Sequence, residues 1–174
     1  MLREHGAALG RVAAAYEADR TRQEDLFQEI CLALWQALPR FRGEATLRTF
    51  VFRVAHNRGL THRMRQARSA PAGHRAGSLE EVAERPDPRP GPDDQADSAR
   101  RRERLLSALR ALPLPARQVL TLTLEGLSQA EIGEVLGLTE NHVAVRLVRA
   151  RRMLRDRLAP DSGGAATGAG EDRR

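Results

Sequence analysis

The amino-acid sequence predicts an all-α fold made of two small helical domains joined by a flexible linker. Apolar residues recur at helical spacing both before residue 66 and after residue 97. Residues 67–97 lie between these segments and are rich in proline, glycine and acidic side chains. Such a composition cannot bury enough apolar surface to offset the entropy of ordering the chain. We expect three helices before this linker and four after it, with at most a short helical turn at 78–84 inside it.

The charged side chains are unevenly distributed along the 174 residues. Residues 40–68 hold eight arginines and one acid, whereas residues 79–97 hold seven acids and two arginines. All 29 basic residues are arginine, which excludes a lysine nucleophile or Schiff base. The segregation of charge indicates two basic surfaces and an acidic tether, as a nucleic-acid-binding protein has.

The first twenty residues carry six charged side chains, and no apolar run approaches membrane-spanning length. We therefore expect no signal peptide, no membrane insertion and a cytoplasmic location. The single cysteine, Cys31, lies within an apolar helical pattern. A single cysteine cannot form an internal disulfide, and the apolar helical pattern around it favours a small core residue over a metal ligand. We expect no metal and no cofactor.

Two helices are expected at residues 4–18 and 23–38. The second is apolar over a wide arc, which leaves a narrow polar strip. That strip holds Asp25, Gln28, Glu29 and Gln36, with Trp35 at its edge. The helix either docks partly on another protein or is the central helix of a small bundle with a solvated stripe. Periodicity alone does not decide between these two interpretations.

A basic loop follows Pro39, and a third helix is expected from about residue 46 to residue 65. The predicted inward face holds Leu47, Phe50, Val51 and Val54. The predicted outward face holds Thr49, Phe52, Arg53, His56, Leu60 and Arg63. An exposed Phe52 among arginines is what a platform for single-stranded nucleic acid requires, because bases stack on the ring and guanidinium groups hold phosphates. Phe52 is alternatively buried against the first helix.

The second domain, residues 98–158, ends in a predicted helix-turn-helix. Ser128 and Glu131 have the spacing of a capping box at the start of one helix. Gly137 supplies a left-handed residue that ends this helix, and Thr139 caps the next one. Two further helices, separated by Pro113, precede this pair.

The last helix divides into two faces. Its inward face holds Val143, Leu147, Ala150 and Leu154, and its far side holds Asn141, Val145, Val148, Arg149, Arg152 and Arg155. Between Glu140 and Leu158 there are six arginines against two acids. A helix of this width and charge fits the major groove of DNA, where arginine bonds guanine and asparagine bonds adenine. A solvated basic face on an ordinary helical hairpin is the alternative.

Two segments together resemble bacterial extracytoplasmic-function (ECF) sigma factors. The sequence QEDLFQEICLALWQALPRFRGEATLRTFVFRVAHNRGL at 23–60 is similar to their promoter-melting domain. The sequence LPLPARQVLTLTLEGLSQAEIGEVLGLTENHVAVRLVRARRML at 112–154 is similar to their promoter-binding domain. The resemblance implies a polymerase-docking and −10 recognition domain at 1–66 and a −35 recognition domain at 98–158, on either side of the linker at 67–97. The composition of residues 159–174 separately predicts a disordered tail. Residues 141–145 of this chain are Asn-His-Val-Ala-Val, whereas many members of the family have Gly-Thr-Val-Lys-Ser at this place.

The resemblance also implies partners and residue roles. The partners are core RNA polymerase, through the clamp helices of its β′ subunit, promoter DNA and an anti-sigma factor. The implied polymerase contacts are Asp25, Gln28, Glu29 and Trp35. The implied −10 contacts are Phe41, Arg42, Phe50, Phe52, Arg53, His56 and Asn57, with a flipped-out base captured in this region. The implied −35 contacts are Ser128, Gln129, Asn141, Val145, Val148, Arg149 and Arg152.

Two other classes of protein compete with this interpretation. A helix-turn-helix transcription regulator that acts without core polymerase would need a dimer interface or a ligand pocket, and the sequence indicates neither. A site-specific recombinase would need a nucleophile, but no serine precedes Ser69 and the only tyrosine, Tyr16, is far from the helix-turn-helix. His56 and His62 lie on different helix faces, so they do not form a metal-ligand set. The sequence therefore predicts a protein that is not an enzyme.

Overall fold

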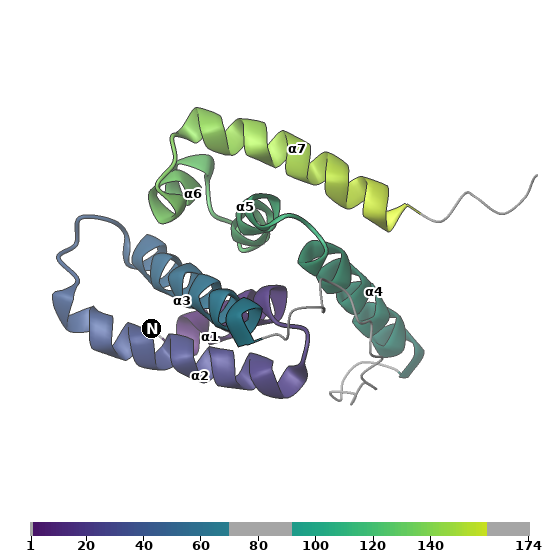
Figure 1. Cartoon of the computed structure of the whole chain (residues 1–174), viewed down its shortest axis with the longest axis horizontal. Helices are drawn as coiled ribbons and strands as arrows, with labels where there is room; N and C mark the ends of the chain where they lie inside the picture. The colour runs from purple at the N-terminus through teal and green to yellow at the C-terminus, as the bar shows by residue number, and fades with distance from the viewer. Residues whose placement is uncertain (1, 70–91, 160–174) are drawn as a thin grey trace, which may run out of the picture.

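The computed structural model describes residues 2–69 and 92–159, and helices connected by short loops make up this part of the chain (Figure 1). The first unit contains α1 (Leu2–Tyr16), α2 (Arg20–Ala37), the short 3-10 helix η1 (Leu38–Arg40) and α3 (Leu47–Ser69). The second contains α4 (Pro92–Arg110), α5 (Leu114–Leu124), α6 (Gln129–Leu136) and α7 (Glu140–Leu158). The predicted all-α fold with three helices before the linker and four after it is confirmed. None of the described helices is long and apolar enough to cross a lipid bilayer.

Helices α1, α2 and α3 pack against one another around a shared apolar core. Asp19 caps α2, because its side chain accepts a hydrogen bond from the backbone N–H of Arg22 at 2.9 Å. The core of this unit includes the fully buried side chains of Leu9, Ile30 and Phe52.

A buried carboxylate, that of Glu17, joins the three helices of the first unit. One oxygen accepts hydrogen bonds from the backbone N–H groups of Ala18 at 2.7 Å and Asp19 at 3.0 Å. The other oxygen lies 2.9 Å from Nε2 of His62 and accepts a hydrogen bond from the Gln66 amide, both on α3. Burial acts to raise the pKa of Glu17, but these hydrogen bonds outweigh burial and hold the pKa below its ordinary value. Glu17 thus stays ionised while it ties the α1–α2 turn to the second half of α3.

The helix-turn-helix has the predicted caps. The Ser128 hydroxyl accepts from the Glu131 N–H at 3.2 Å, and the Glu131 carboxylate accepts from the Ser128 N–H at 2.8 Å. Gly137 has φ +67°, a left-handed conformation that costs glycine little. The Thr139 side chain accepts a hydrogen bond from the N–H at the third position of α7, at 3.4 Å. A Cβ atom at Gly133 would lie 2.6 Å from the backbone carbonyl oxygen of Leu138, in the turn between α6 and α7. Only glycine therefore allows the turn to pack this closely against α6.

Helical structure extends further into the predicted linker than the sequence indicates. Helix α3 continues to Ser69 and α4 begins at Pro92, so helices include the first three and the last six residues of 67–97. Proline is tolerated at a helix start because its missing N–H has no intrahelical partner there. The predicted helical turn at 78–84, the remainder of the linker and the tail at 160–174 lie outside the described residues.

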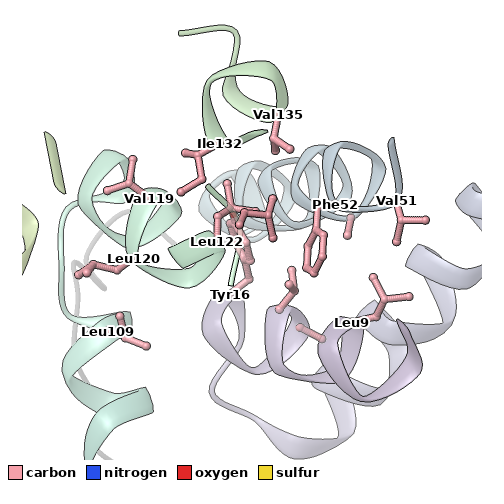
Figure 2. Packing of buried hydrophobic residues seen from close by; sticks show 14 of the residues in the cluster. Leu9, Tyr16, Val51, Phe52, Leu109, Val119, Leu120, Leu122, Ile132 and Val135 are labelled. Carbon is pink, nitrogen blue, oxygen red and sulfur yellow. The ribbon is translucent and has the colours of Figure 1, made fainter. Parts of the chain in front are cut away.

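The two units pack against each other and share one apolar cluster. Helix α6 lies against α3, and α1 contacts α4 and α5 (Figure 1). Figure 2 shows Leu122 of α5 beside Tyr16 of α1, and Ile132 and Val135 of α6 facing α3. The sequence predicted two domains joined by a tether and gave no indication of this direct contact.

Candidate nucleic-acid interface

Helix α7 has the two faces that its sequence predicts. Val143, Leu147 and Ala150 are buried against the second unit, and Leu154 is half-buried. The far side is exposed along its length and carries Asn141, Val145, Val148, Arg149, Arg152 and Arg155. Val148 is 69% exposed, although an apolar side chain gains nothing from contact with water. No carboxylate in the described ranges lies within ion-pair distance of any α7 arginine.

This face combines free guanidinium groups, one amide and two exposed valines on a single rigid helix. Guanidinium groups without a carboxylate partner can donate hydrogen bonds to phosphate oxygens or to the edge of guanine. Valine methyl groups can contact the methyl group of thymine. Ser128 and Gln129, at the start of α6, are also exposed. The Ser128 hydroxyl is engaged in the capping box, because its oxygen accepts from the Glu131 N–H and its O–H is hydrogen-bonded to the Glu131 carboxylate.

The predicted orientation of α3 is wrong for four residues. Leu47, which was predicted to face inward, is exposed at the start of the helix. Phe52 is 1% exposed, His56 1% and Thr49 0%, whereas the sequence placed all three on the outward face. The buried stripe of α3 instead contains Val51, Phe52, Ala55 and His56. Apolar residues occur all around this helix, so their spacing favours no single face. The alternative that Phe52 is buried, against the first helix of the chain, agrees with its place in the core shared with α1 (Figure 2).

His56 is held in the core by the only tyrosine. The Tyr16 hydroxyl and His56 Nδ1 share a hydrogen bond of 2.6 Å, and the two rings meet edge to face with centroids 5.5 Å apart. Burial raises the pKa of Tyr16 and lowers the pKa of His56 to about 3. His56 is therefore neutral at physiological pH and offers no positive charge to a nucleic acid.

The remaining predicted −10 residues are at least partly accessible. Arg42, Arg53 and Asn57 are exposed. Phe41 and Phe50 are half-buried and pack together, with ring centroids 4.9 Å apart and planes at 47°. Phe50 lies on the predicted inward face, but it contributes to an aromatic pair at the junction of the α2–α3 loop and α3. These five residues, which we call the loop–α3 surface, combine two rings in tilted contact with guanidinium and amide groups.

Helix α2 presents an exposed apolar and polar stripe. Trp35 is 73% exposed, and Asp25 and Gln28 are also exposed. Leu32 lies on the same stripe at helical spacing and is 54% exposed. Leu32 was not among the predicted site residues, although its helical spacing from Gln28 and Trp35 is visible in the sequence. Glu29 is half-buried, and both of its carboxylate oxygens lie 3.5 Å from Nη1 of Arg65, so it is partly engaged within the fold.

The chain matches family models in both halves. Residues 1–69 match Sigma-70 region 2, and residues 102–154 match Sigma-70, region 4. The RNA polymerase sigma factor CnrH of Cupriavidus metallidurans is 32% identical over 165 residues, which cover 93% of this chain and 86% of that protein. The ECF RNA polymerase sigma factor ShbA of Streptomyces griseus is 34% identical over 134 residues, 76% of this chain and 69% of that protein.

Solved structures of sigma factors have the same fold. CnrH, in complex with the cytosolic domain of CnrY, has a TM-score of 0.66 and 28% identity, with 92% of this chain and 86% of that chain covered. RpoE from Bartonella quintana, in complex with the anti-sigma factor NepR, has a TM-score of 0.70, with 92% and 95% covered. At 21% identity, this second likeness supports the fold alone. The chain belongs to the extracytoplasmic-function family of bacterial RNA polymerase sigma factors.

Proposed function

We propose that this sigma factor binds core RNA polymerase through α2, reads the −35 element with α7 and holds the −10 element on the loop–α3 surface. The observation that carries the proposal is the far side of α7. It presents Asn141, Val145, Val148, Arg149 and Arg152 to solvent on one helix, and no described carboxylate neutralises its arginines. An unpaired basic face with apolar contacts fits a DNA groove better than it fits water.

The −10 role follows from exposure and stacking. A base that leaves the duplex needs an aromatic or apolar surface to replace its lost stacking, which costs a few kcal/mol. Phe41 and Phe50 form such a surface, and Arg42, Arg53 and Asn57 supply hydrogen-bond donors around it. Phe52 and His56 are not part of the proposed surface, because both are buried.

The polymerase role follows from the exposed stripe of α2. Interface hot spots are enriched in tryptophan, and Trp35 is the most exposed large apolar side chain of the described residues. Leu32 extends the apolar area, and Asp25 and Gln28 add polar contacts beside it. This arrangement supports contact of α2 with the clamp helices of the β′ subunit.

An anti-sigma factor is a further proposed partner. The related RpoE was solved with the anti-sigma factor NepR, and CnrH was solved with the cytosolic domain of CnrY. A regulator of the same kind would bind this chain at surfaces that polymerase or promoter DNA also needs.

Transcription in vitro tests the proposal directly. Purified chain is added to core RNA polymerase on a library of genomic fragments, and start sites are mapped. We expect a small set of start sites that requires both proteins, with permanganate-reactive thymines near each start. A folded chain that binds specific DNA equally well without core polymerase, and supports no start site with it, would instead indicate a regulator that acts alone.

A further inference from the structure

The two units are joined by hydrogen bonds that converge on one residue in the α5–α6 turn. The Glu125 carboxylate accepts two hydrogen bonds from Arg11 of α1, from Nε at 2.8 Å and from Nη2 at 2.6 Å. The Arg48 guanidinium of α3 donates to the backbone carbonyl of the same residue. Arg110 of α4 also donates to the Ala14 carbonyl of α1, at 3.2 Å. Residues far apart in the sequence therefore hold the first unit against the second.

The Arg11–Glu125 pair is stronger than an ordinary surface ion pair. The Glu125 side chain is 4% exposed, whereas that of Arg11 is 49% exposed. The two parallel hydrogen bonds fit the fork of the guanidinium to the carboxylate, which gives both strength and a fixed geometry. The hydrogen bond to Glu125 raises the pKa of Arg11 above its ordinary value, although burial acts to lower it. One partner is thus desolvated, while the other remains accessible to water and salt.

The same packing buries a cation that is incompletely paired. Arg117 of α5 is 3% exposed, and its Nε and Nη1 atoms have no hydrogen-bond partner among the described residues. Its Nη2 donates to the backbone carbonyls of Arg110 and, at 3.2 Å, Leu112. Burial, followed by the nearby Arg63 of α3, lowers the pKa of Arg117 to about 10. Because buried donors without partners are unfavourable, separation of the units would relieve this arrangement.

The closed arrangement is too small to read both promoter elements. Elements centred at −35 and −10 are about 25 base pairs apart, or about 85 Å at 3.4 Å per base pair. A compact unit of the described size has a radius of gyration of about 14 Å, and so a diameter of about 40 Å. Helix α3 ends at Ser69 and α4 begins at Pro92, so 22 residues (70–91) connect them, and a chain of this length reaches about 75 Å when fully extended. The units must therefore separate when both elements are bound.

We propose that Glu125 is a latch residue that holds this sigma factor closed through Arg11 and Arg48, and that opening the latch precedes simultaneous binding of the two promoter elements. The effect of the latch on promoter binding rests on the proposed function. The latch itself is a property of the free chain. Opening would also release Arg48, next to the loop–α3 surface, from the Glu125 carbonyl. A guanidinium that fastens the closed state thereby becomes available to a DNA phosphate.

Single-molecule energy transfer measures the closed and open populations of the full chain. Cys31→Ala removes the native thiol, and Thr21→Cys with Arg157→Cys places one dye on α2 and one at the end of α7, both at exposed positions. Glu125→Gln keeps the size of the side chain and removes its charge. We expect Glu125→Gln to raise the ratio of open to closed chain by about threefold to tenfold. The lower limit corresponds to the loss of an exposed ion pair, and the upper limit to the loss of charge-assisted hydrogen bonds. High salt should raise the open fraction of the parent chain as well.

Two further variants identify the cause. Arg11→Gln should have the same effect as Glu125→Gln, and the double variant should add little to either, because one interaction has been removed in all three. Glu24→Gln is the matched control, since Glu24 pairs with Arg20 at 4.0 Å within α2 and touches no second unit. It should leave the open fraction unchanged.

The possible results separate the latch from the proposed function. If Glu125→Gln leaves the open fraction unchanged at every salt concentration, the latch is overturned, whatever the chain does in transcription. If the open fraction rises as expected, Glu125→Gln should also give tighter binding to a promoter that carries both elements, in the presence of core polymerase, by about the same factor, because more of the chain is competent to reach both elements. A rise without tighter binding or promoter activity would leave the latch in place and contradict the proposed function.

Discussion

The buried, neutral His56 should make the protein less stable in mild acid, because there its ring takes up a proton only in the unfolded chain. Its pKa falls from the model-peptide value of 6.5 to about 3 in the folded chain, because the ring is fully buried. Between these two values the unfolded chain binds a proton that the folded chain does not, so the free energy of unfolding decreases as pH falls. The slope is about 1.4 kcal/mol per pH unit. From pH 7.5 to pH 5.0 the expected loss is therefore about 2 kcal/mol from this residue alone.

Urea denaturation followed by circular dichroism, at pH 7.5 and at pH 5.0, measures this loss. His56→Gln cannot take up the proton, so its free energy of unfolding should change about 2 kcal/mol less between the two pH values than that of the parent chain. His142→Gln is the control, since His142 is exposed on α7. Glu17 contributes little in this range, because its lowered pKa means that its stabilisation is lost only below about pH 4.5. An equal pH dependence of His56→Gln and the parent chain would refute the neutral, buried state of His56.

Four other substitutions test the remaining assignments. Phe52→Ala should reduce stability by about 3–5 kcal/mol in urea denaturation, as expected for a core ring and not for an exposed stacking platform. Gly133→Ala should lower stability by about 1–3 kcal/mol, because its Cβ would meet a backbone carbonyl at 2.6 Å, whereas Gly6→Ala has open space and should be neutral or stabilising. Arg149→Ala should cost about 1–3 kcal/mol of discrimination at one position of the −35 element in binding assays, and a uniform loss on all sequences would reduce Arg149 to a phosphate contact. Trp35→Ala should leave stability within about 0.5 kcal/mol but weaken core polymerase binding by about thirtyfold, and unchanged affinity in a titration would remove Trp35 from the interface.

The helix-turn-helix could be predicted closely because its determinants are local. The capping box of Ser128 and Glu131, the left-handed Gly137 and the Thr139 cap all act within a few residues of each other. The faces of α7 are equally local, since apolar and basic residues alternate there with a clear helical period. Such features need no knowledge of the surrounding structure.

The orientation of α3 could not be predicted in the same way. Apolar residues are spread around the helix, so the contacts of the folded chain decide which ones are buried. Tyr16 approaches α3 so closely that a Cβ at Gly59 would lie 2.7 Å from its ring. This approach, together with the Tyr16 hydrogen bond to His56, turns the His56 side of α3 inward. Which side of α3 is buried therefore depends on its packing against α1, which the sequence of α3 alone does not indicate.

The contact between the two units depends on residues that are even further apart in sequence. Arg11 and Glu125 are separated by 114 positions, and neither has a neighbour in the sequence that indicates its partner. A proline-rich segment predicted freedom between the halves, and it gave no information about their affinity for each other. Periodicity describes which side of a helix is apolar, but it does not state which other helix will cover that side.

The carboxylate of Glu17 sets a practical limit on how the first unit can be isolated. Its partners His62 and Gln66 lie well beyond the last residue of α3 that contributes to the apolar core, Leu60. An expression fragment that stopped near residue 60 would keep the apolar core of the first unit. It would leave the buried Glu17 carboxylate with hydrogen bonds from backbone N–H groups alone. Fragments for spectroscopy or crystallisation should therefore retain α3 at least to Gln66.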